Sequence, residues 1–493
     1  MTVARGQRSP LRDRMRAIGH DRAMRRIASA SVSAVLFVSA LAAQSEAPAK
    51  PQPQSQVELA PLLDEFCRPL IDSEVAMGLV VGVIDGDRRE VRGYGKARLE
   101  LDGAPDADTL FEIGSISKVF TGVLLAHAVA RGEVALLDLA QQHMPEGKTL
   151  PKTDANQIRI VDLATHMSGL PRLPDGMVPH GDDPYAAFTR EELFEGSCRS
   201  MLRNEPGTVY EYSNLGAALL GQLLVDRAGA SSYEQLLHDR VLKPLAMDRT
   251  SIELQGSMTA ALASGCNADL AYVQPWNLAA FAPAGGIRSS MTDMLKFARA
   301  QWTVLAAANS ADSLAMAREK QRDIPGGLGI GLGWHIAKDG TTRWHNGETG
   351  GFHSMLLVRT EDRRAVCILA NTATSVVDSV AELILRRLCG ADVKPLKFER
   401  PIAVADDQLE LLCGIYELQP GIAVAVTREG SVLRAQITGQ TALRILPRSP
   451  TEFFYRQVQA TIRFAKDGEE VTGLELEQAG RRSKWKKLQQ KLR

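Results

Sequence analysis

Hydrophobic and polar positions divide the chain into a first part that mixes helix and strand periods and a last part with strand periods alone. Leucines on one face predict a helix over 57–70, and strand-like runs predict strands over 77–84 and 89–95, joined at an Asp-Gly-Asp turn that is a hairpin signal. An apolar stripe after Lys118 predicts a helix that ends at Gly132. By the same criteria we expect helices at 158–170, 215–228, 291–303 and 376–389, and strands at 329–336, 342–345, 352–359 and 365–370.

The last part of the chain follows a proline-containing linker over 391–405. Beyond it, short β-prone runs recur at close spacing from 413 to 478, which predicts a small up-and-down barrel or half-barrel. The basic stretch 481–493 is expected to be a solvated terminus. Two interpretations of this β domain stay open. It covers the mouth of a functional site or mediates oligomers, or it is a passive stabilising module.

The first 43 residues are typical of a secretory signal, with a basic start, an apolar run over 27–43 and a small-x-small pattern near its end. Met24 is an alternative start, and a short membrane anchor is the alternative interpretation of the apolar run. We therefore expect an exported protein, periplasmic or secreted. Its parts are predicted as a signal over 1–43, a linker over 44–57, a main domain over 58–390, a linker over 391–405 and a C-terminal β domain over 406–493.

Charge and cysteine content narrow the classes of partner. The 58 basic residues balance the 58 acidic ones, so nothing calls for a nucleic acid as partner. The six cysteines form no Cys-x-x-Cys pair, which argues against a zinc ribbon or a thioredoxin motif. No His-Glu-x-x-His motif is present, and we expect neither a metal nor a cofactor.

The strongest chemical signal is Ser115, three residues before Lys118 at the start of a predicted helix. Positions i and i+3 share a helix face, so the lysine amine can reach the serine hydroxyl and act as its base once burial lowers its pKa. The helix N-terminus adds backbone N–H groups suited to an oxyanion. Because the bare pattern also occurs at Ser483 and Lys486, its flanks must decide its meaning.

Those flanks, Phe-Glu-Ile-Gly before the serine and Ser117 before the lysine, resemble the nucleophile motif of the class C β-lactamases and their relatives. The relatives include penicillin-binding proteins, D-amino-acid peptidases and serine esterases. The stretch 163–171, which contains His166, and the glycine turn in 283–290 resemble two further landmarks of the family. We assign His166 a structural role and the glycine turn no chemistry of its own.

Tyr212-Ser213-Asn214 resembles the second motif of the family, Tyr-x-Asn. The resemblance implies that Tyr212 moves protons between Ser115 and the leaving group, and that the Asn214 amide holds Lys118 and binds a substrate carbonyl. Whether Lys118 or Tyr212 is the base stays open. The alternative interpretation is a helix start that Ser213 caps.

The third motif, Lys-Thr-Gly in class C β-lactamases, has two candidates. Lys338-Asp339-Gly340 keeps the lysine but is typical of a hairpin turn, so we choose His345-Asn346-Gly347, which resembles the His-x-Gly variant. His345 and Gly347 would then bind substrate, and the N–H groups of Ser115 and Glu348 would form the oxyanion hole. A neutral histidine is a weaker carboxylate anchor than lysine, which puts efficient β-lactam hydrolysis in doubt.

The resemblance implies an α/β (α+β) fold: an antiparallel sheet flanked by helices, with an all-helical lobe. The C-terminal β domain is additional. Three functions stay open: hydrolysis of β-lactams or related amides, a D-amino-acid peptidase or carboxylesterase, and a penicillin-binding sensor that acylates without turnover. The expected partners are small-molecule or peptide substrates, and oligomers stay possible.

Overall fold

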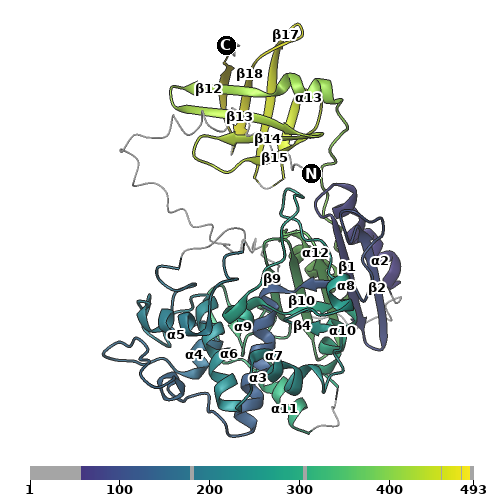
Figure 1. Ribbon diagram of the computed structural model, residues 1–493. Helices are drawn as coiled ribbons and strands as arrows, with labels where there is room; N and C mark the ends of the chain where they lie inside the picture. Colours follow the sequence, from purple (N-terminus) through teal and green to yellow (C-terminus); the bar gives the residue numbers. More distant parts are fainter. Residues whose placement is uncertain (1–56, 178–182, 304–307, 457, 479, 489–493) are drawn as a thin grey trace, which may run out of the picture. The chain divides into compact units, whose positions relative to one another are not determined.

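The computed structural model describes residues 57–177, 183–303, 308–456, 458–478 and 480–488. The predicted signal and nearly all of the first linker lie outside these residues. The chain separates into two compact units, one over Gln56–Arg400 and one over Pro401–Arg493. Figure 1 traces both in sequence colours, and we describe each unit by itself.

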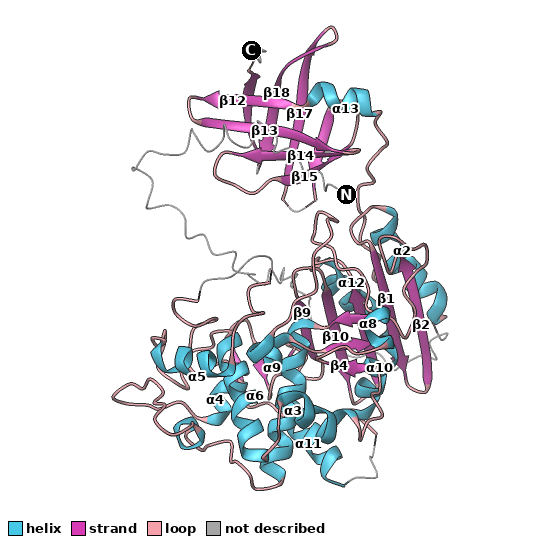
Figure 2. Cartoon of the chain, viewed as in Figure 1, coloured by secondary structure: helices cyan, strands magenta, loops and turns pink. Residues whose placement is uncertain are grey.

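The first unit is built on an eight-stranded antiparallel sheet with strand order β2-β1-β11-β10-β9-β8-β7-β6. Figure 2 shows its strands with helices against them. Its strands are β1 (Gly78–Asp85), β2 (Arg88–Gly95), β6 (Arg322–Ile324), β7 (Leu328–Ile330), β8 (His335–Ile336), β9 (Arg343–Glu348), β10 (His353–Arg359) and β11 (Arg364–Ala370). Every pairing within the sheet is antiparallel, as the hairpin signals predict.

Residues of the central strands alternate between two cores. On one face Val81, Leu357 and Ile368 pack against helices α2 (Leu59–Asp72) and α12 (Val376–Leu388). On the other face Val80 and Leu356 join the main core with the remaining helices, apart from α8 (Ser257–Ala261), which buries no residue. These helices are α3 (Ser117–Ala130), α4 (Ile160–Ala164), α5 (Arg190–Arg199), α6 (Asn214–Ala228), α7 (Tyr233–Leu237), α9 (Ala282–Gly285), α10 (Met291–Ala300) and α11 (Ala308–Arg318). Burial of the sheet on both faces explains why its strands are apolar almost throughout.

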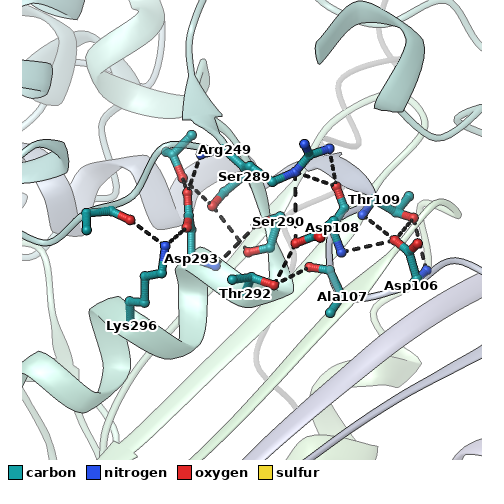
Figure 3. Close-up of polar contacts among 12 residues, drawn as sticks. Asp106, Ala107, Asp108, Thr109, Arg249, Ser289, Ser290, Thr292, Asp293 and Lys296 are labelled. Carbon is teal, nitrogen blue, oxygen red and sulfur yellow. Dashed lines mark hydrogen bonds and ion pairs between the residues drawn. The ribbon is translucent and has the colours of Figure 1, made fainter. Parts of the chain in front are cut away.

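A small three-stranded sheet carries the chain into the Ser115 segment. Its order is β3 (Leu110–Glu112), β5 (Arg288–Ser290) and β4 (Thr250–Ser251). Behind it, the fully buried Asp293 accepts hydrogen bonds from the Arg249 backbone N–H at 2.7 Å and the Thr250 hydroxyl at 2.9 Å, and pairs with Lys296 at 2.9 Å. Figure 3 shows this network joining the start of α10 to the loop before β3. The network fixes the loop before β3, the strand that leads into Ser115.

The second unit is a closed antiparallel barrel of eight strands, so the predicted β domain is confirmed as a barrel. The strands are β12 (Gly414–Gln419), β13 (Ile422–Glu429), β14 (Val432–Ile437), β15 (Leu443–Pro447), β16 (Glu452–Tyr455), β17 (Ala460–Asp467), β18 (Glu470–Gln478) and β19 (Arg481–Lys487). A helix, α13 (Asp406–Leu412), precedes them and was not expected. Its Leu409 and Leu412 are buried in the barrel core.

Three sequence predictions of local structure are wrong. The single strand expected over 329–336 is two short strands, β7 and β8, which pair with each other. The basic stretch 481–493 is not a solvated terminus throughout, because β19 pairs with both β18 and β12 and closes the barrel. Trp485 is buried in the barrel core, whereas its neighbours Lys484 and Lys486 are exposed. With one apolar residue in the strand, the sequence shows no strand pattern. The helix expected over 158–170 ends at Ala164, because His166 takes a positive φ of 58° and turns the chain.

Candidate active site

Ser115 and Lys118 meet where β3 enters α3. A single 3-10 turn, η1 (Gly114–Ile116), carries Ser115, and Gly114 before it has a φ of +50°. Lys118 is 3% exposed, and its Nζ lies 2.9 Å from Ser115 Oγ and 2.6 Å from the Ala284 carbonyl oxygen. Burial, with a contribution from the Arg172 charge, lowers the pKa of Lys118 well below its ordinary value. A neutral amine next to a serine hydroxyl is a suitable proton acceptor.

Tyr212 lies on the extended segment before α6, whose first turn Ser213 caps by accepting the Gly216 N–H at 2.9 Å. Its ring centroid is 4.8 Å from Lys118 Nζ and 5.2 Å from the Arg172 guanidinium carbon. Burial raises the pKa of Tyr212 to about 12, while a hydrogen bond from Ser115 and the Arg172 charge act in the opposite direction. The phenol is therefore protonated at neutral pH.

Asn214, the first residue of α6, lines the same pocket as Ser115. Its Oδ1 is buried and accepts no hydrogen bond from the described residues. We expected Asn214 to hold the Lys118 amine. That amine donates a hydrogen bond to the Ala284 carbonyl oxygen instead. The glycine turn thus contributes a backbone acceptor, although the sequence suggested no chemistry for it.

Strand β9 brings the third motif against the Ser115 turn. A Cβ on Gly347 would lie 2.0 Å from the Ile113 carbonyl oxygen and 2.8 Å from the Ser115 nitrogen, so only glycine fits there. A Cβ on Gly114 would lie 2.6 Å from the Glu348 nitrogen. The Ser115 and Glu348 N–H groups, expected to share the oxyanion, therefore belong to two touching segments. The competing Lys338-Asp339-Gly340 forms a turn between β8 and β9.

His345 is 1% exposed, and its Nδ1 lies 2.5 Å from the Asn346 carbonyl oxygen. Burial, followed by the charges of neighbouring His335 and Lys118, lowers the pKa of His345 well below its ordinary value. The ring is thus neutral, as expected for a histidine at the position where class C β-lactamases carry a lysine. The role of His345 in binding substrate stays a prediction.

His166 contributes packing and a hydrogen bond. Its ring lies 4.4 Å from the Tyr212 ring, and its Nδ1 accepts the Ser213 N–H at 3.2 Å. The Glu211 N–H bonds to the His166 carbonyl oxygen at 2.8 Å. These contacts explain its left-handed backbone, because the turn presents both acceptors to the Tyr212 segment.

The walls of the pocket contain residues that the sequence did not single out. Around Ser115, Asn214 and Glu348 it is lined by Tyr185, Trp276, Leu278, Phe281, Ala284, Gly285 and Thr349. The Tyr185 ring lies 5.7 Å from that of Trp276 and 5.2 Å from that of Phe281. Tyr185 and Trp276 come from irregular segments and Phe281 from a single 3-10 turn, so no periodic pattern marks these aromatic residues.

Comparison with known proteins identifies the family. The family model described as Beta-lactamase matches residues 63–389. A β-lactamase of Escherichia coli K12 is 31% identical over 275 residues, which cover 54% of this chain and 68% of that protein.

The chain belongs to the β-lactamase family. This family member is also 28% identical over 320 residues to the D-alanyl-D-alanine-carboxypeptidase/endopeptidase AmpH of the same organism, covering 61% of this chain and 79% of that protein. Among solved structures, a class C β-lactamase superposes with a TM-score of 0.59 at 21% identity, covering 66% of this chain and 96% of that one. A β-lactamase/D-alanine carboxypeptidase from Yersinia pestis, solved with citrate, gives 0.56 at 22% identity, covering 67% and 98%. The predicted family and fold class are confirmed.

Three further observations concern the described residues. They contain no group of three or more His, Cys, Asp or Glu side chains placed to hold a metal ion. None of their helices is long and apolar enough to cross a membrane. All six cysteines are free thiols, and Cys67, Cys266 and Cys367 are buried.

Proposed function

We propose that this member of the β-lactamase family is an exported serine hydrolase that opens β-lactams or related amides through an acyl-enzyme on Ser115. The observation that carries the proposal is the 2.9 Å contact between Ser115 Oγ and Lys118 Nζ, with Lys118 buried and its pKa lowered. This contact supplies a nucleophile, and the lowered pKa of Lys118 favours the neutral amine that a base requires.

In the proposed mechanism, the Lys118 amine takes the Ser115 proton as Oγ attacks the substrate carbonyl. The N–H groups of Ser115 and Glu348 stabilise the oxyanion. The proton then passes from Lys118 through the Tyr212 hydroxyl to the leaving nitrogen as the C–N bond breaks. A water molecule, deprotonated along the same route, attacks the acyl-enzyme and restores Ser115.

We assign the base role to Lys118 because burial acts oppositely on the two candidates. It lowers the pKa of Lys118, which favours the free amine, and raises that of Tyr212 to about 12, which favours the protonated phenol. Tyr212 then serves as a proton relay. Asn214, with its unpartnered Oδ1, is proposed to bind the substrate amide N–H.

A second candidate, a D-amino-acid peptidase, is favoured by His345. A buried neutral imidazole stands where class C β-lactamases carry a lysine, and AmpH, a relative at 28% identity, is a carboxypeptidase and endopeptidase by name. The scaffold and the acylation step would be the same. Only the leaving group and the rate of deacylation distinguish the two functions.

The test compares the mature chain with Ser115→Ala on a chromogenic cephalosporin, a D-alanyl-D-alanine peptide and a short-chain p-nitrophenyl ester. Intact-mass spectrometry follows the covalent adduct. Ser483→Ala is the matched control, because Ser483 belongs to the other Ser-x-x-Lys pattern and lies on β19 of the barrel.

Cephalosporin turnover that requires Ser115 supports the first function, and peptide turnover alone supports the second. Ester turnover alone would favour a carboxylesterase, and a stable adduct without product release would indicate the sensor. Turnover or adduct formation that survives Ser115→Ala would contradict the nucleophile assignment.

A further inference from the structure

A buried histidine, His353, joins β9 to α12 next to the proposed oxyanion hole. It is the first residue of β10 and is 2% exposed. Its Nδ1 lies 2.9 Å from a Glu348 carboxylate oxygen, and its Nε2 lies 2.9 Å from a carboxylate oxygen of Asp378. The second oxygen of Asp378 accepts the Asn346 amide N–H at 2.7 Å. The network therefore includes the residues on both sides of Gly347.

The geometry determines the charge of this histidine. Carboxylate oxygens accept hydrogen bonds and donate none, so both ring nitrogens must carry a proton. Burial alone would disfavour this imidazolium, but the hydrogen bonds and charges of Asp378 and Glu348 outweigh it and raise the pKa of His353 to about 9. Farther along α12, burial and the Asp378 charge raise the pKa of Glu382, and the Arg386 charge acts in the opposite direction. Across the sheet His353 pairs with Ala370, which is uncharged.

The same histidine lies directly opposite the proposed oxyanion residue on the neighbouring strand. In the register of β9 and β10, Glu348 stands opposite His353 and Gly347 stands opposite Ser354. The Ser354 hydroxyl donates to the Ile113 carbonyl oxygen at 2.8 Å, two residues before Ser115. Glu348 thus lies opposite His353 in the ladder and is bound to it by its side chain, on a strand that touches the Ser115 turn.

We propose that His353 is a positioning residue that holds the Glu348 N–H at the oxyanion and neutralises carboxylate charge beside it. This inference rests on the proposed function. It goes beyond that function by adding a residue that touches neither substrate nor nucleophile. The Glu348 side chain is 58% exposed and borders the pocket, so without a cation its negative charge would oppose an oxyanion on its own N–H.

Loss of this cation should slow acylation more than it weakens substrate binding. His353→Gln keeps the approximate size, but its amide has one donor end and one acceptor end, so the oxygen must face a carboxylate. We expect the rate of acylation of Ser115 to fall by about 10- to 100-fold, less than for the loss of an oxyanion donor, because the Glu348 N–H is misplaced and not removed. The binding constant for the non-covalent complex should change by less than about threefold.

A second substitution provides a rescue. Adding Asp378→Asn to His353→Gln places an N–H opposite the new amide oxygen, while the other atom of that group still accepts the Asn346 N–H. This double variant should acylate faster than His353→Gln alone. A protein in which His353 only stabilises the fold would regain stability without a change in rate per active site.

The matched control is His143→Gln in the helical lobe. His143 Nε2 lies 3.1 Å from an Asp138 carboxylate oxygen, so the same chemical change is made at another partly buried histidine–carboxylate pair. Stopped-flow acylation by the chromogenic cephalosporin is measured for all variants and normalised to the Ser115 that becomes acylated in intact-mass spectra. His143→Gln should acylate at the wild-type rate.

The outcomes separate this inference from the proposed function. If His353→Gln acylates within about twofold of wild type per acylatable Ser115, the inference is wrong and the proposed function stands. A rate loss that His143→Gln reproduces would also contradict it. If the wild-type chain forms no Ser115-dependent adduct, both are wrong.

Discussion

The Arg172 guanidinium carbon lies 5.2 Å from the centroid of the Tyr212 ring, and the residue is exposed. Its backbone carbonyl accepts the N–H groups of Asn214 and Leu215, each at 3.1 Å, which ties it to the start of α6. Its charge favours the deprotonated forms of Lys118 and Tyr212. Arg172 therefore places a permanent cation beside the proposed base and the proposed proton relay.

Removing this cation should shift the pH profile of the enzyme. In Arg172→Gln the protonated form of Lys118 no longer experiences repulsion from a neighbouring cation. The pKa of Lys118 therefore rises, and the acidic limb of kcat/KM moves to higher pH. We expect a shift of up to about one pH unit, because an exposed charge is partly screened by solvent.

Arg172→Lys should keep most of the wild-type profile, and added salt should reproduce part of the loss in the wild type. The measurement is kcat/KM against pH at two ionic strengths. An acidic limb that stays in place in Arg172→Gln would contradict the electrostatic role.

Gly347→Ala should separate β9 from the Ser115 turn. The new Cβ would lie 2.0 Å from the Ile113 carbonyl oxygen, a distance that only a backbone shift can relieve. Because the loss of one oxyanion donor costs about 100- to 1000-fold in rate, we expect a kcat loss of that order when β9 moves away from the Ser115 turn. Thermal unfolding measured in parallel checks that the sheet still forms, and a folded variant with wild-type kcat would show that β9 does not form the oxyanion hole.

His353 should make stability depend on alkaline pH. Its pKa is raised from 6.5 to about 9, so its contribution is fully present below about pH 6.5 and is lost as pH rises through 9. The lost contribution is on the order of 3 kcal/mol, the free energy of a shift of this size. Chemical denaturation at several pH values should give a steeper alkaline decline for the wild type than for His353→Gln, and parallel curves would contradict the imidazolium assignment.

Trp485→Ala should destabilise the barrel. The side chain is 5% exposed, and its Nε1 donates to the Ser483 hydroxyl at 2.8 Å on the strand that closes the barrel. Truncation of a buried tryptophan costs about 3–5 kcal/mol. Calorimetry should show the barrel transition at lower temperature, whereas Lys484→Ala, on the exposed side of β19, should leave it unchanged. Equal effects of the two variants would contradict the inward orientation of Trp485.

Local patterns predicted most of the secondary structure. The apolar runs of 77–84 and 365–370 become β1 and β11, which pair in the sheet, and the leucine stripe of 57–70 becomes α2. They failed where long-range contacts override local preference. At His166 the apolar period continues, but the chain turns to present two acceptors to the Tyr212 segment. In β19 a single tryptophan supplies the core contact, too little for a strand pattern to detect.

By itself, the sequence determined the family, the mixed fold with its C-terminal barrel, and the residues Ser115, Lys118, Tyr212 and Gly347 as candidates, because each belongs to a short motif with its own chemistry. The tertiary structure alone decided which atoms meet: Ala284 and Arg172 with the base and the relay, the aromatic pocket wall, and His353 with Glu348 and Asp378. These contacts join segments far apart in the chain. The charge and protonation that they impose depend on burial, which no spacing along the sequence records.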